Sequence, residues 1–313
     1  MTLMSNMRDN CQRDRMHVFA YASCATQGAR NYQEDMAKVL ADGQAKPATA
    51  KDQTLSDDHK SAVSQLIAVL ADGMGGHAGG DLASRMVCET FLGSFTQKNN
   101  TTGPKNSPDN NSETRQESDV GLLCSVPERL LNALNESNEA LAKRVKSEPM
   151  LTGMGTTLIG VSFAAHGVHW VSVGDSPLML YRRGEIAHLN EDHSLAPELD
   201  RLAQAGQISF EEARSDPRRH MLRSAVTGDD LDLIDHSRKA LELATGDYVI
   251  LASDGVHALE ENEIERIITA YSDDGTQAVA NALIRAVEAV RDPHQDNATV
   301  VVVRVMQAME EAG

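Results

Sequence analysis

The sequence from Val69 to Gly80 is VLADGMGGHAGG, which joins an apolar run to a stretch with almost no side chains. The apolar run predicts a buried strand, and Asp72 ends it with a charge. One interpretation is an ordinary turn, because Asp-Gly pairs often terminate strands. The other is that the glycines bring the backbone close to a ligand that Asp72 also holds. The rest of the chain decides between the two.

The composition is that of an acidic protein with an aliphatic core. Of the 313 residues, 41% are hydrophobic and 4% aromatic, and the formal net charge is -17. This charge disfavours nucleic acid and anionic membranes as partners, and it suits a protein that collects divalent cations. No apolar run is long enough for a membrane helix, and residues 1–19 lack the apolar segment of a signal peptide. We therefore expect a soluble, cytoplasmic protein.

Two polar segments interrupt the apolar pattern, one over residues 41–62 and the other over residues 97–121. The second segment is almost devoid of apolar residues, which is typical of a loop without a core of its own. Helical periodicity appears on both sides of it, so we expect an insertion between helices of one domain. The predicted organisation is a polar extension over residues 1–15 followed by a single domain over residues 16–308.

The remaining segments predict strands and helices in blocks rather than in strict alternation. Strands are expected where β-branched and apolar residues cluster, and helices where apolar residues recur every three or four positions. Such blocks favour antiparallel sheets with helices packed outside them, an α+β arrangement. The expected strands cover residues 17–28, 64–72, 156–167, 168–176, 177–190, 247–253 and 298–305, and the expected helices cover residues 80–95, 126–147, 196–215, 261–271 and 276–290.

Acidic residues stand at the ends of several predicted strands. Asp72 ends one strand, Asp254 follows the strand 247–253, and Asp296 precedes the last strand. If the last two strands are antiparallel neighbours, Asp254 and Asp296 meet at one edge of the sheet. Asp72 joins them there provided that its strand runs alongside 247–253. Further acids in the strand regions are Glu34, Asp35 and Asp175.

Carboxylates gathered in one place repel one another unless a cation lies between them. Oxygen ligands without a cluster of His or Cys select hard cations such as Mg²⁺ or Mn²⁺. Two such ions sharing a carboxylate lower the pKa of a water between them, and the resulting hydroxide is suited to attack on phosphorus. On this hypothesis Asp72 bridges two metals, Gly73 offers a backbone carbonyl, and Gly75 and Gly76 allow a sharp turn.

Seven blocks of the sequence occur together in an order that is typical of one family. They resemble the metal-dependent protein serine/threonine phosphatases of type 2C in their bacterial form, over roughly residues 16–306 apart from the two polar segments. The resemblance implies a four-layer α-β-β-α sandwich of two antiparallel sheets flanked by helices, with a binuclear metal site at one end. The blocks are GARNYQED, LADGMGGHAGG, GMGTTL, VSVGDSPLMLYRRGEIAHLNEDHS, HMLRSAVTG, GDYVILASDGV and DNATVVVV.

The resemblance also implies which residues hold the metals. One acid bridges both ions beside a carbonyl ligand, two acids serve the first ion, and one further acid, with another acid beside it, serves the second ion directly or through water. A weaker third ion is implied at a separate acid, for which the alternative is a turn-capping role. In that order these residues are Asp72 and Gly73, then Asp254 and Asp296, then Asp35 with Glu34 beside it, and finally Asp175.

Two further residues are implied to act on the phosphate ester. Arg30 resembles the phosphate-binding arginine, since a guanidinium fork matches two phosphate oxygens, and the alternative is a surface arginine. Eukaryotic members have a histidine after the Asp-Gly pair as a proposed general acid, but here that place holds Met74. His77 is the nearby substitute, either as a general acid or as a simple loop histidine. Other departures from the family pattern are Gln33 for Asn, Pro177 for Arg and Ala258 for Asp.

A basic segment stands out in this acidic chain, because EARSDPRRHMLR concentrates positive charge. In the family this region resembles a flap beside the active site, and we expect it to orient phosphoprotein substrates. The alternative is a solvated turn with local ion pairs. The residues concerned are Arg218, Arg219 and Arg223, together with Arg214 and His220.

The function expected from the sequence is hydrolysis of phosphoserine and phosphothreonine esters on proteins, with Mn²⁺ or Mg²⁺ as cofactor. The expected substrates are proteins phosphorylated by a serine/threonine kinase, and the expected state is a monomer. Two alternatives stay open at this point. One is a signalling module that binds phosphoproteins without efficient catalysis, and the other is a phosphatase of a small phosphorylated metabolite.

Overall fold

The structure is a computed structural model that describes residues 17–42, 44–47, 62–75, 78–96 and 124–308. The predicted N-terminal extension, most of both polar insertions, Gly76 and His77 lie outside these residues. No helix in the described ranges is long and apolar enough to cross a membrane.

The described residues form two antiparallel sheets, which confirms the predicted α+β class. The seven-stranded sheet has the order β10-β7-β6-β4-β2-β3, with β5 paired beside β4. The five-stranded sheet has the order β1-β12-β11-β8-β9. The strands are β1 (His17–Thr26), β2 (Asp35–Ala41), β3 (Gln44–Pro47), β4 (Leu66–Met74), β5 (Gly155–Thr156), β6 (Leu158–Ala164), β7 (Gly167–Val173), β8 (Leu178–Arg182), β9 (Glu185–His188), β10 (Asp235–His236), β11 (Tyr248–Ala252) and β12 (Ala298–Gln307).

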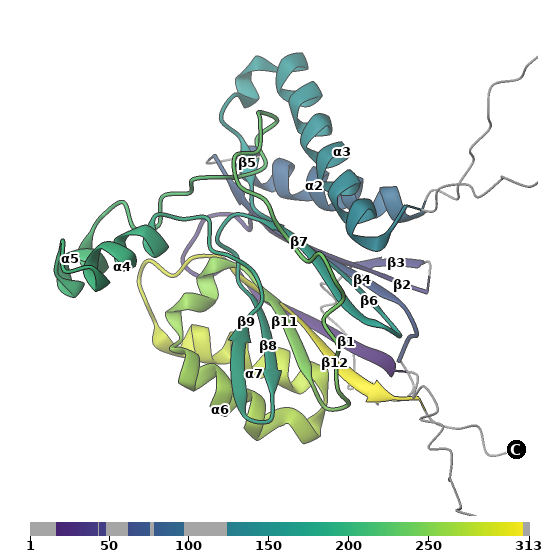
Figure 1. Ribbon diagram of the computed structural model, residues 1–313. Coiled ribbons are helices and arrows are strands. Elements are labelled where there is room, and N and C mark those ends of the chain that lie inside the picture. The colour runs from purple at the N-terminus through teal and green to yellow at the C-terminus, as the bar shows by residue number, and fades with distance from the viewer. Residues whose placement is uncertain (1–16, 43, 48–61, 76–77, 97–123, 309–313) are drawn as a thin grey trace, which may run out of the picture.

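The helices lie on the outer faces of the two sheets, as Figure 1 shows. Helices α2 (Ala78–Thr96) and α3 (Val126–Ser147) cover the seven-stranded sheet, and α6 (Glu261–Tyr271) and α7 (Thr276–Val290) cover the five-stranded sheet. This confirms the expected four-layer sandwich. Three short 3₁₀ helices complete these parts of the chain, namely η1 (Pro149–Leu151), η2 (Asp254–Ala258) and η3 (Ser272–Asp274).

The central strands are buried on both faces, which explains why their sequences are continuous apolar runs. In β4, Leu66, Ala68 and Leu70 belong to the core between the two sheets. The intervening Val69 and Ala71 pack instead against the helices on the outer face. Because side chains alternate along a strand, the next residue on the inner face after Leu70 is Asp72. The inner layer therefore changes from apolar to acidic at this end of the sandwich.

The acidic end lies opposite the two ends of the described chain. In the β1–β12 pair, His17 lies beside Gln307 at one end, and Thr26 lies beside Ala298 at the other. Asp296 immediately precedes the second end. The register of β2 and β4 places Asp35 directly opposite Asp72, at the corresponding end of the other sheet.

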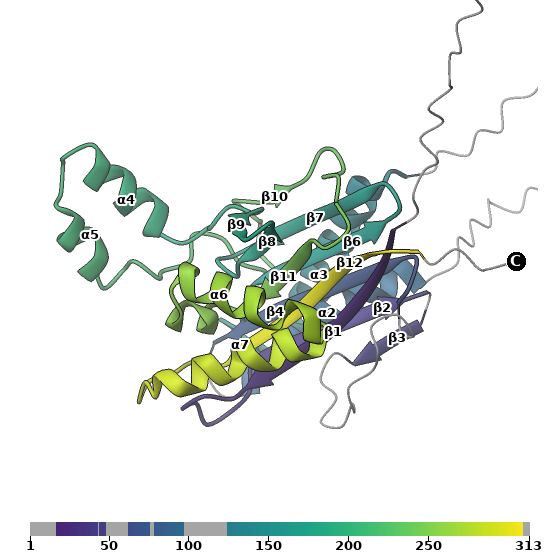
Figure 2. The ribbon, with the colours of Figure 1, turned by 90° about the horizontal axis from the view of Figure 1, so that it is seen from below.

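The helical segment 196–215 differs from its prediction as one helix. It forms α4 (Ala196–Gln204) and α5 (Phe210–Ser215), which are separated by a turn at Gly206 with a φ of 70°. Ser209 and Glu212 form a capping box that starts the second helix. Figures 1 and 2 both show α4 and α5 projecting from the body of the sandwich.

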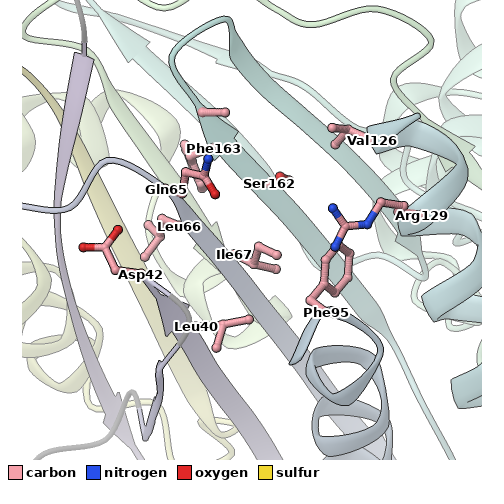
Figure 3. Close-up of a pocket in the computed structure, with 11 residues that line it drawn as sticks. Leu40, Asp42, Gln65, Leu66, Ile67, Phe95, Val126, Arg129, Ser162 and Phe163 are labelled. Carbon is pink, nitrogen blue, oxygen red and sulfur yellow. The ribbon is translucent and has the colours of Figure 1, made fainter. Parts of the chain in front are cut away.

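A pocket of about 240 Å³ lies at the end of the seven-stranded sheet that is remote from the acids. Leu66 at the start of β4 and Phe163 near the end of β6 contribute to it, together with Phe95 of α2 and Arg129 of α3 on its helical side (Figure 3). The Arg129 guanidinium lies 4.9 Å from the centroid of the Phe95 ring. None of the acids predicted as metal ligands lines this pocket.

Candidate active site

Two of the predicted metal-binding acids are cross-strand partners on the seven-stranded sheet. Asp35 opens β2, and Asp72 lies opposite it near the end of β4. The side chain of Asp35 is almost completely buried, with 6% of the residue exposed, and Asp72 is partly buried. The sequence prediction did not include a separate strand over residues 35–41. The direct pairing of Asp35 with Asp72 is therefore known only from the structure.

Asp254 and Asp296 come from the other sheet. Asp254 begins η2 directly after β11, and Asp296 precedes β12. The two strands are antiparallel neighbours, as predicted, with Ala252 opposite Val300. However, β4 does not run alongside β11, because the two strands belong to different sheets. The acids therefore gather across the end of the sandwich and not along the edge of one sheet.

These carboxyl groups strongly affect one another's protonation. Burial raises the pKa of Asp35 to about 6. Burial, followed by the charges of Asp35 and Asp254, raises the pKa of Asp72 well above its ordinary value. Burial and the charge of Asp296 raise the pKa of Asp254. These interactions link the four groups into one electrostatic cluster, in which burial and mutual repulsion account for the raised pKa values.

The donor set fits a hard divalent cation. Oδ1 of Asp35 and Oδ1 of Asp254 are buried without a hydrogen-bond partner among the described residues. Buried polar atoms normally have a partner, so these two oxygens need an explanation. A cation would supply one, since carboxylate oxygens are the ligands of Mg²⁺ and Mn²⁺. Within the described ranges, no group of three or more His, Cys, Asp or Glu side chains is close enough together to hold a metal ion as the side chains lie.

The backbone around Asp72 is fixed by two buried threonines. The Thr156 hydroxyl donates to the Asp72 carbonyl at 2.7 Å, and the Asp72 N–H donates to Thr157 Oγ1 at 3.0 Å. Thr157 Oγ1 also lies 2.8 Å from Ser176 Oγ, beside Asp175. The predicted strand over residues 156–167 starts with these two threonines. Thr156 does lie in β5, and both residues hold the main chain of an acid that is a candidate ligand.

The glycines of the opening stretch meet the backbone of other segments. A Cβ atom on Gly73 would lie 2.3 Å from the carbonyl oxygen of Gly80 and 2.7 Å from that of Glu34. Gly75 has a φ of 118°, which confirms the predicted sharp turn there. The close approach at Gly73 is thus to the backbone of the first turn of α2 and of the residue before β2. Its role as a carbonyl ligand stays a prediction.

Arg30 lies in this cluster, in the loop that connects β1 to β2. Its guanidinium forms an ion pair with Asp296 and is close enough to Asp254 and Glu34 for their charges to raise its pKa further. About half of the Arg30 side chain is exposed, so it remains accessible from solution. The ion pair places Arg30 at the acidic end, its exposure also agrees with the alternative of a surface arginine, and its role in binding phosphate stays a prediction.

The loop that carries Arg30 is held by Asn297, a residue to which the sequence analysis gave no role. Asn297 Nδ2 donates to the carbonyls of Gln27 and Tyr32, each at 2.9 Å. Its Oδ1 accepts the Glu34 N–H at 2.8 Å. Gln33, a departure from the family pattern, accepts the Asp35 N–H at 3.1 Å. In the sequence, the only signal for this role of Asn297 is its position next to Asp296.

Asp175 follows β7, as predicted, and belongs to the same acidic end. Burial, followed by the charges of Asp254 and Asp192, raises its pKa to about 7. Among its described neighbours, Gly174 has a φ of 107°, so the chain turns sharply just before it. Asp175 is therefore electrostatically linked to Asp254, while its separate metal remains a prediction.

The basic segment carries its own acidic partners. Arg218 pairs with Asp216 at 2.8 Å, and Arg219 pairs with Asp200 of α4 at 2.8 Å. Arg223 lies 3.9 Å from Glu198, which is a longer and weaker contact. These pairs agree with the alternative of local ion pairs, although they do not test substrate binding. Arg219 is 21% exposed and Arg218 is 66% exposed, so only the latter is largely available to a partner.

With the fold and the site described, the family can be stated. Residues 46–282 match the model of the protein phosphatase 2C family. The chain belongs to this family, as its sequence blocks predicted.

The relatives of the chain are bacterial phosphatases. It is 32% identical over 251 residues to the serine/threonine protein phosphatase PstP of Mycobacterium tuberculosis, covering 80% of this chain and 42% of the relative. It is 32% identical over 206 residues to the serine/threonine phosphatase stp of Listeria monocytogenes, covering 65% of this chain and 72% of the relative. The chain thus spans less than half the length of the mycobacterial protein.

Solved structures give the same result for the fold. A crystal structure of the M. tuberculosis phosphatase PstP superposes with a TM-score of 0.66 at 27% identity, covering 93% of this chain and 100% of that one. Another structure, of the PstP catalytic domain in complex with two manganese ions, has a TM-score of 0.64 at 26% identity, with the same coverage.

Proposed function

We propose that this chain hydrolyses phosphoserine and phosphothreonine esters on proteins, using divalent cations held at the acidic end of the sandwich. The observation that carries the proposal is the convergence of Asp35, Asp72, Asp254 and Asp296 from two sheets, two of them with a buried carboxylate oxygen that has no hydrogen-bond partner among the described residues. The names of the relatives support the substrate class, and the manganese complex of PstP supports the cofactor.

Each residue of the site has a proposed task. Asp72 and the carbonyl of Gly73 would bridge and hold two ions, with the other acids completing the ligand set. Divalent cations at such a site supply Lewis-acid stabilisation of the phosphate and lower the pKa of bound water. Arg30 would bind two phosphate oxygens with its guanidinium fork. Asp175 is the proposed ligand of a third, weaker ion.

The leaving alkoxide also needs a proton from a general acid. Met74 cannot donate one, and His77, the predicted substitute, lies outside the described residues. We keep His77 as the proposed general acid, because a histidine titrates near neutral pH. The monomeric state and the cytoplasmic location also stay predictions from the sequence.

Phosphate release from a phosphothreonine peptide tests the proposal. The full chain is stripped with a chelator and assayed with and without added Mn²⁺ or Mg²⁺. We expect turnover only with the cation, and we expect Asp254→Asn to abolish it, because the substitution removes an anionic ligand from a doubly charged ion. Asp273→Asn, an exposed acid of η3, is the matched control and should retain full activity.

The same assay separates the two alternative functions. Peptide binding without release of phosphate, in the presence of Mn²⁺, would indicate a binding module. Cation-dependent hydrolysis of small phosphate esters, with phosphopeptides left intact, would indicate a metabolite phosphatase. Either result would overturn the proposed substrate class.

A further inference from the structure

A buried serine connects the two halves of the acidic site. Ser253 lies between β11 and Asp254, and it is 0% exposed. Its hydroxyl donates to Oδ2 of Asp35 at 2.7 Å. Asp35 belongs to β2 of the seven-stranded sheet, whereas Ser253 follows a strand of the five-stranded sheet. This hydrogen bond therefore crosses the sandwich between residues that are 218 positions apart in the chain.

The direction of this hydrogen bond is fixed by the backbone of β12. The Thr299 N–H donates to Ser253 Oγ at 2.9 Å, and the Ser253 N–H donates to the Thr299 carbonyl at 3.0 Å. A hydroxyl has a single hydrogen to donate. Since the Thr299 N–H is itself the donor to Oγ, the Ser253 hydrogen is left for Asp35. The main-chain N–H of Thr299 thus fixes the orientation of the Ser253 hydroxyl.

This contact gives the two carboxylate oxygens of Asp35 different environments. Oδ2 accepts from Ser253, while Oδ1 is buried with no hydrogen-bond partner among the described residues. A carboxylate held at one oxygen keeps its other oxygen in a defined place. Without the Ser253 hydroxyl, Oδ2 of Asp35 would lose its donor inside the protein, and the carboxyl group would be held less firmly.

We propose that Ser253 is a positioning residue that fixes the Asp35 carboxylate, so that one of its oxygens is presented to a divalent cation or to a water of that cation. Because Ser253 directly precedes Asp254, the same residue couples the placement of ligands on both sheets. The inference rests on the proposed metal-dependent function. Groups that orient ligands in this way typically change metal affinity by roughly 10- to 100-fold when they are removed.

The chain offers a matched control for the loss of a buried hydroxyl. Ser172 of β7 is 1% exposed, and its Oγ has no hydrogen-bond partner among the described residues. Ser172→Ala and Ser253→Ala delete the same atom from equally buried places. Only the second deletion removes a donor from Asp35.

Mn²⁺ titration of the chelator-stripped full chain tests the proposal by calorimetry, without reference to activity. We expect Ser253→Ala to weaken Mn²⁺ binding at least about tenfold and Ser172→Ala to leave it unchanged. For variants that bind too weakly for calorimetry, the affinity is obtained from the rise of the melting temperature with Mn²⁺. If Ser253→Ala does not fold, Ser253→Cys, a much weaker donor of similar size, takes its place with the same expected direction.

A double-substitution cycle with Asp35→Ala shows whether Ser253 acts through Asp35. In the Asp35→Ala background, Ser253→Ala should have little further effect on Mn²⁺ affinity, because the group that it positions is absent. Wild-type Mn²⁺ affinity in Ser253→Ala, or an equal loss with and without Asp35, would overturn the proposal. A wild-type chain that binds no Mn²⁺ would instead overturn the proposed function on which it rests.

Discussion

At the scale of single residues, the site is defined by carboxylates in places where carboxylates are costly. Asp35 is nearly inaccessible to solvent, and its pKa and those of Asp72 and Asp254 are raised chiefly by burial. Replacing such groups with neutral ones should relieve repulsion in the metal-free protein. The acidic end is therefore expected to lower the stability of the fold, as functional sites often do.

This argument leads to a prediction for Asp175, whose pKa is raised to about 7. A carboxyl whose folded pKa exceeds its unfolded pKa stabilises the protein at low pH, and this contribution is lost as the pH rises through 7. In the presence of a chelator, the stability of Asp175→Asn relative to wild type should therefore increase as the pH is raised from 5 to 8. Each unit of pKa shift corresponds to about 1.4 kcal/mol, so the free energy of unfolding of the variant should exceed that of wild type by at most a few kcal/mol.

Urea unfolding at several pH values measures this difference. Comparing the variant with wild type at each pH cancels the titration of the buried histidines, which both proteins share. The same measurement on Asp273→Asn, an exposed acid of η3, serves as the control. A flat difference for Asp175→Asn would show that Asp175 titrates normally in the folded protein.

At the scale of elements, alternation along the strands explains where the acids lie. The inner faces of β2, β4 and β11 are apolar through the core, and each next inner position is polar, namely Asp35, Asp72 and Ser253. On the outer faces, which pack against helices, Glu34 precedes Met36 of β2 and Asp254 follows Ala252 of β11, so acidic residues also occur there at this end. Strand alternation alone thus places these three side chains in the layer between the sheets.

The packing of α2 on the seven-stranded sheet depends on one small residue. Gly160 in β6 faces Phe91 of α2, and a Cβ atom added there would lie 2.1 Å from the Phe91 ring. Gly160→Ala should destabilise the protein by about 1–3 kcal/mol, because the ring must move in a packed core. Gly93 of α2 has no atoms within 4 Å of an added Cβ. Gly93→Ala should instead stabilise it by up to about 1 kcal/mol, since alanine favours the helix.

Chemical denaturation of both alanine variants checks these opposite signs. Phe91→Leu, which shortens the facing side chain, should reduce the penalty of Gly160→Ala. If both alanine variants shift the stability in the same direction, the contact between α2 and β6 is not as described.

At the scale of the whole molecule, the α4–α5 unit is distinct from the layered body (Figure 2). It has a small core of its own around Leu199, Ala203 and Ala213. Arg219 connects its last turn to Asp200 of α4, whereas Arg218 contacts Asp216 in its own turn. Arg219 is therefore needed for the shape of the unit, and Arg218 is the better probe of contact with a substrate.

We predict that Arg218→Ala raises KM for a phosphoprotein by about two- to fivefold, in line with the strength of an exposed ion pair. The Arg218 N–H still donates to Asp216 in this variant, so the turn should persist. The kinetics with a small aryl phosphate should not change. Arg266→Ala, an exposed arginine of α6, serves as the control. Equal effects of Arg218→Ala on both substrates would contradict a docking role for the projecting unit.

The sequence was sufficient to predict most elements and the acids, but not how they meet. Strand-end acids such as Asp72 and Asp254 follow from local apolar runs. Their assignment to different sheets depends on long-range pairing, which no local pattern encodes. The contacts of Ser253 and Asn297 were missed for the same reason, since a buried hydroxyl or amide has no sequence period. The split of residues 196–215 into two helices could have been predicted at Gly206.

The central claim is that acids from both sheets form one divalent-cation site, and calorimetric Mn²⁺ titration of Asp72→Asn tests it most directly. Asp72 lies opposite Asp35 and interacts electrostatically with Asp254, so its loss should affect every ion of the site. The chelator-stripped wild-type chain should bind two Mn²⁺ ions tightly. Asp72→Asn should lose at least one binding event and weaken the other by about tenfold or more, while Asp273→Asn should match wild type. Unchanged stoichiometry and affinity in Asp72→Asn would contradict the account.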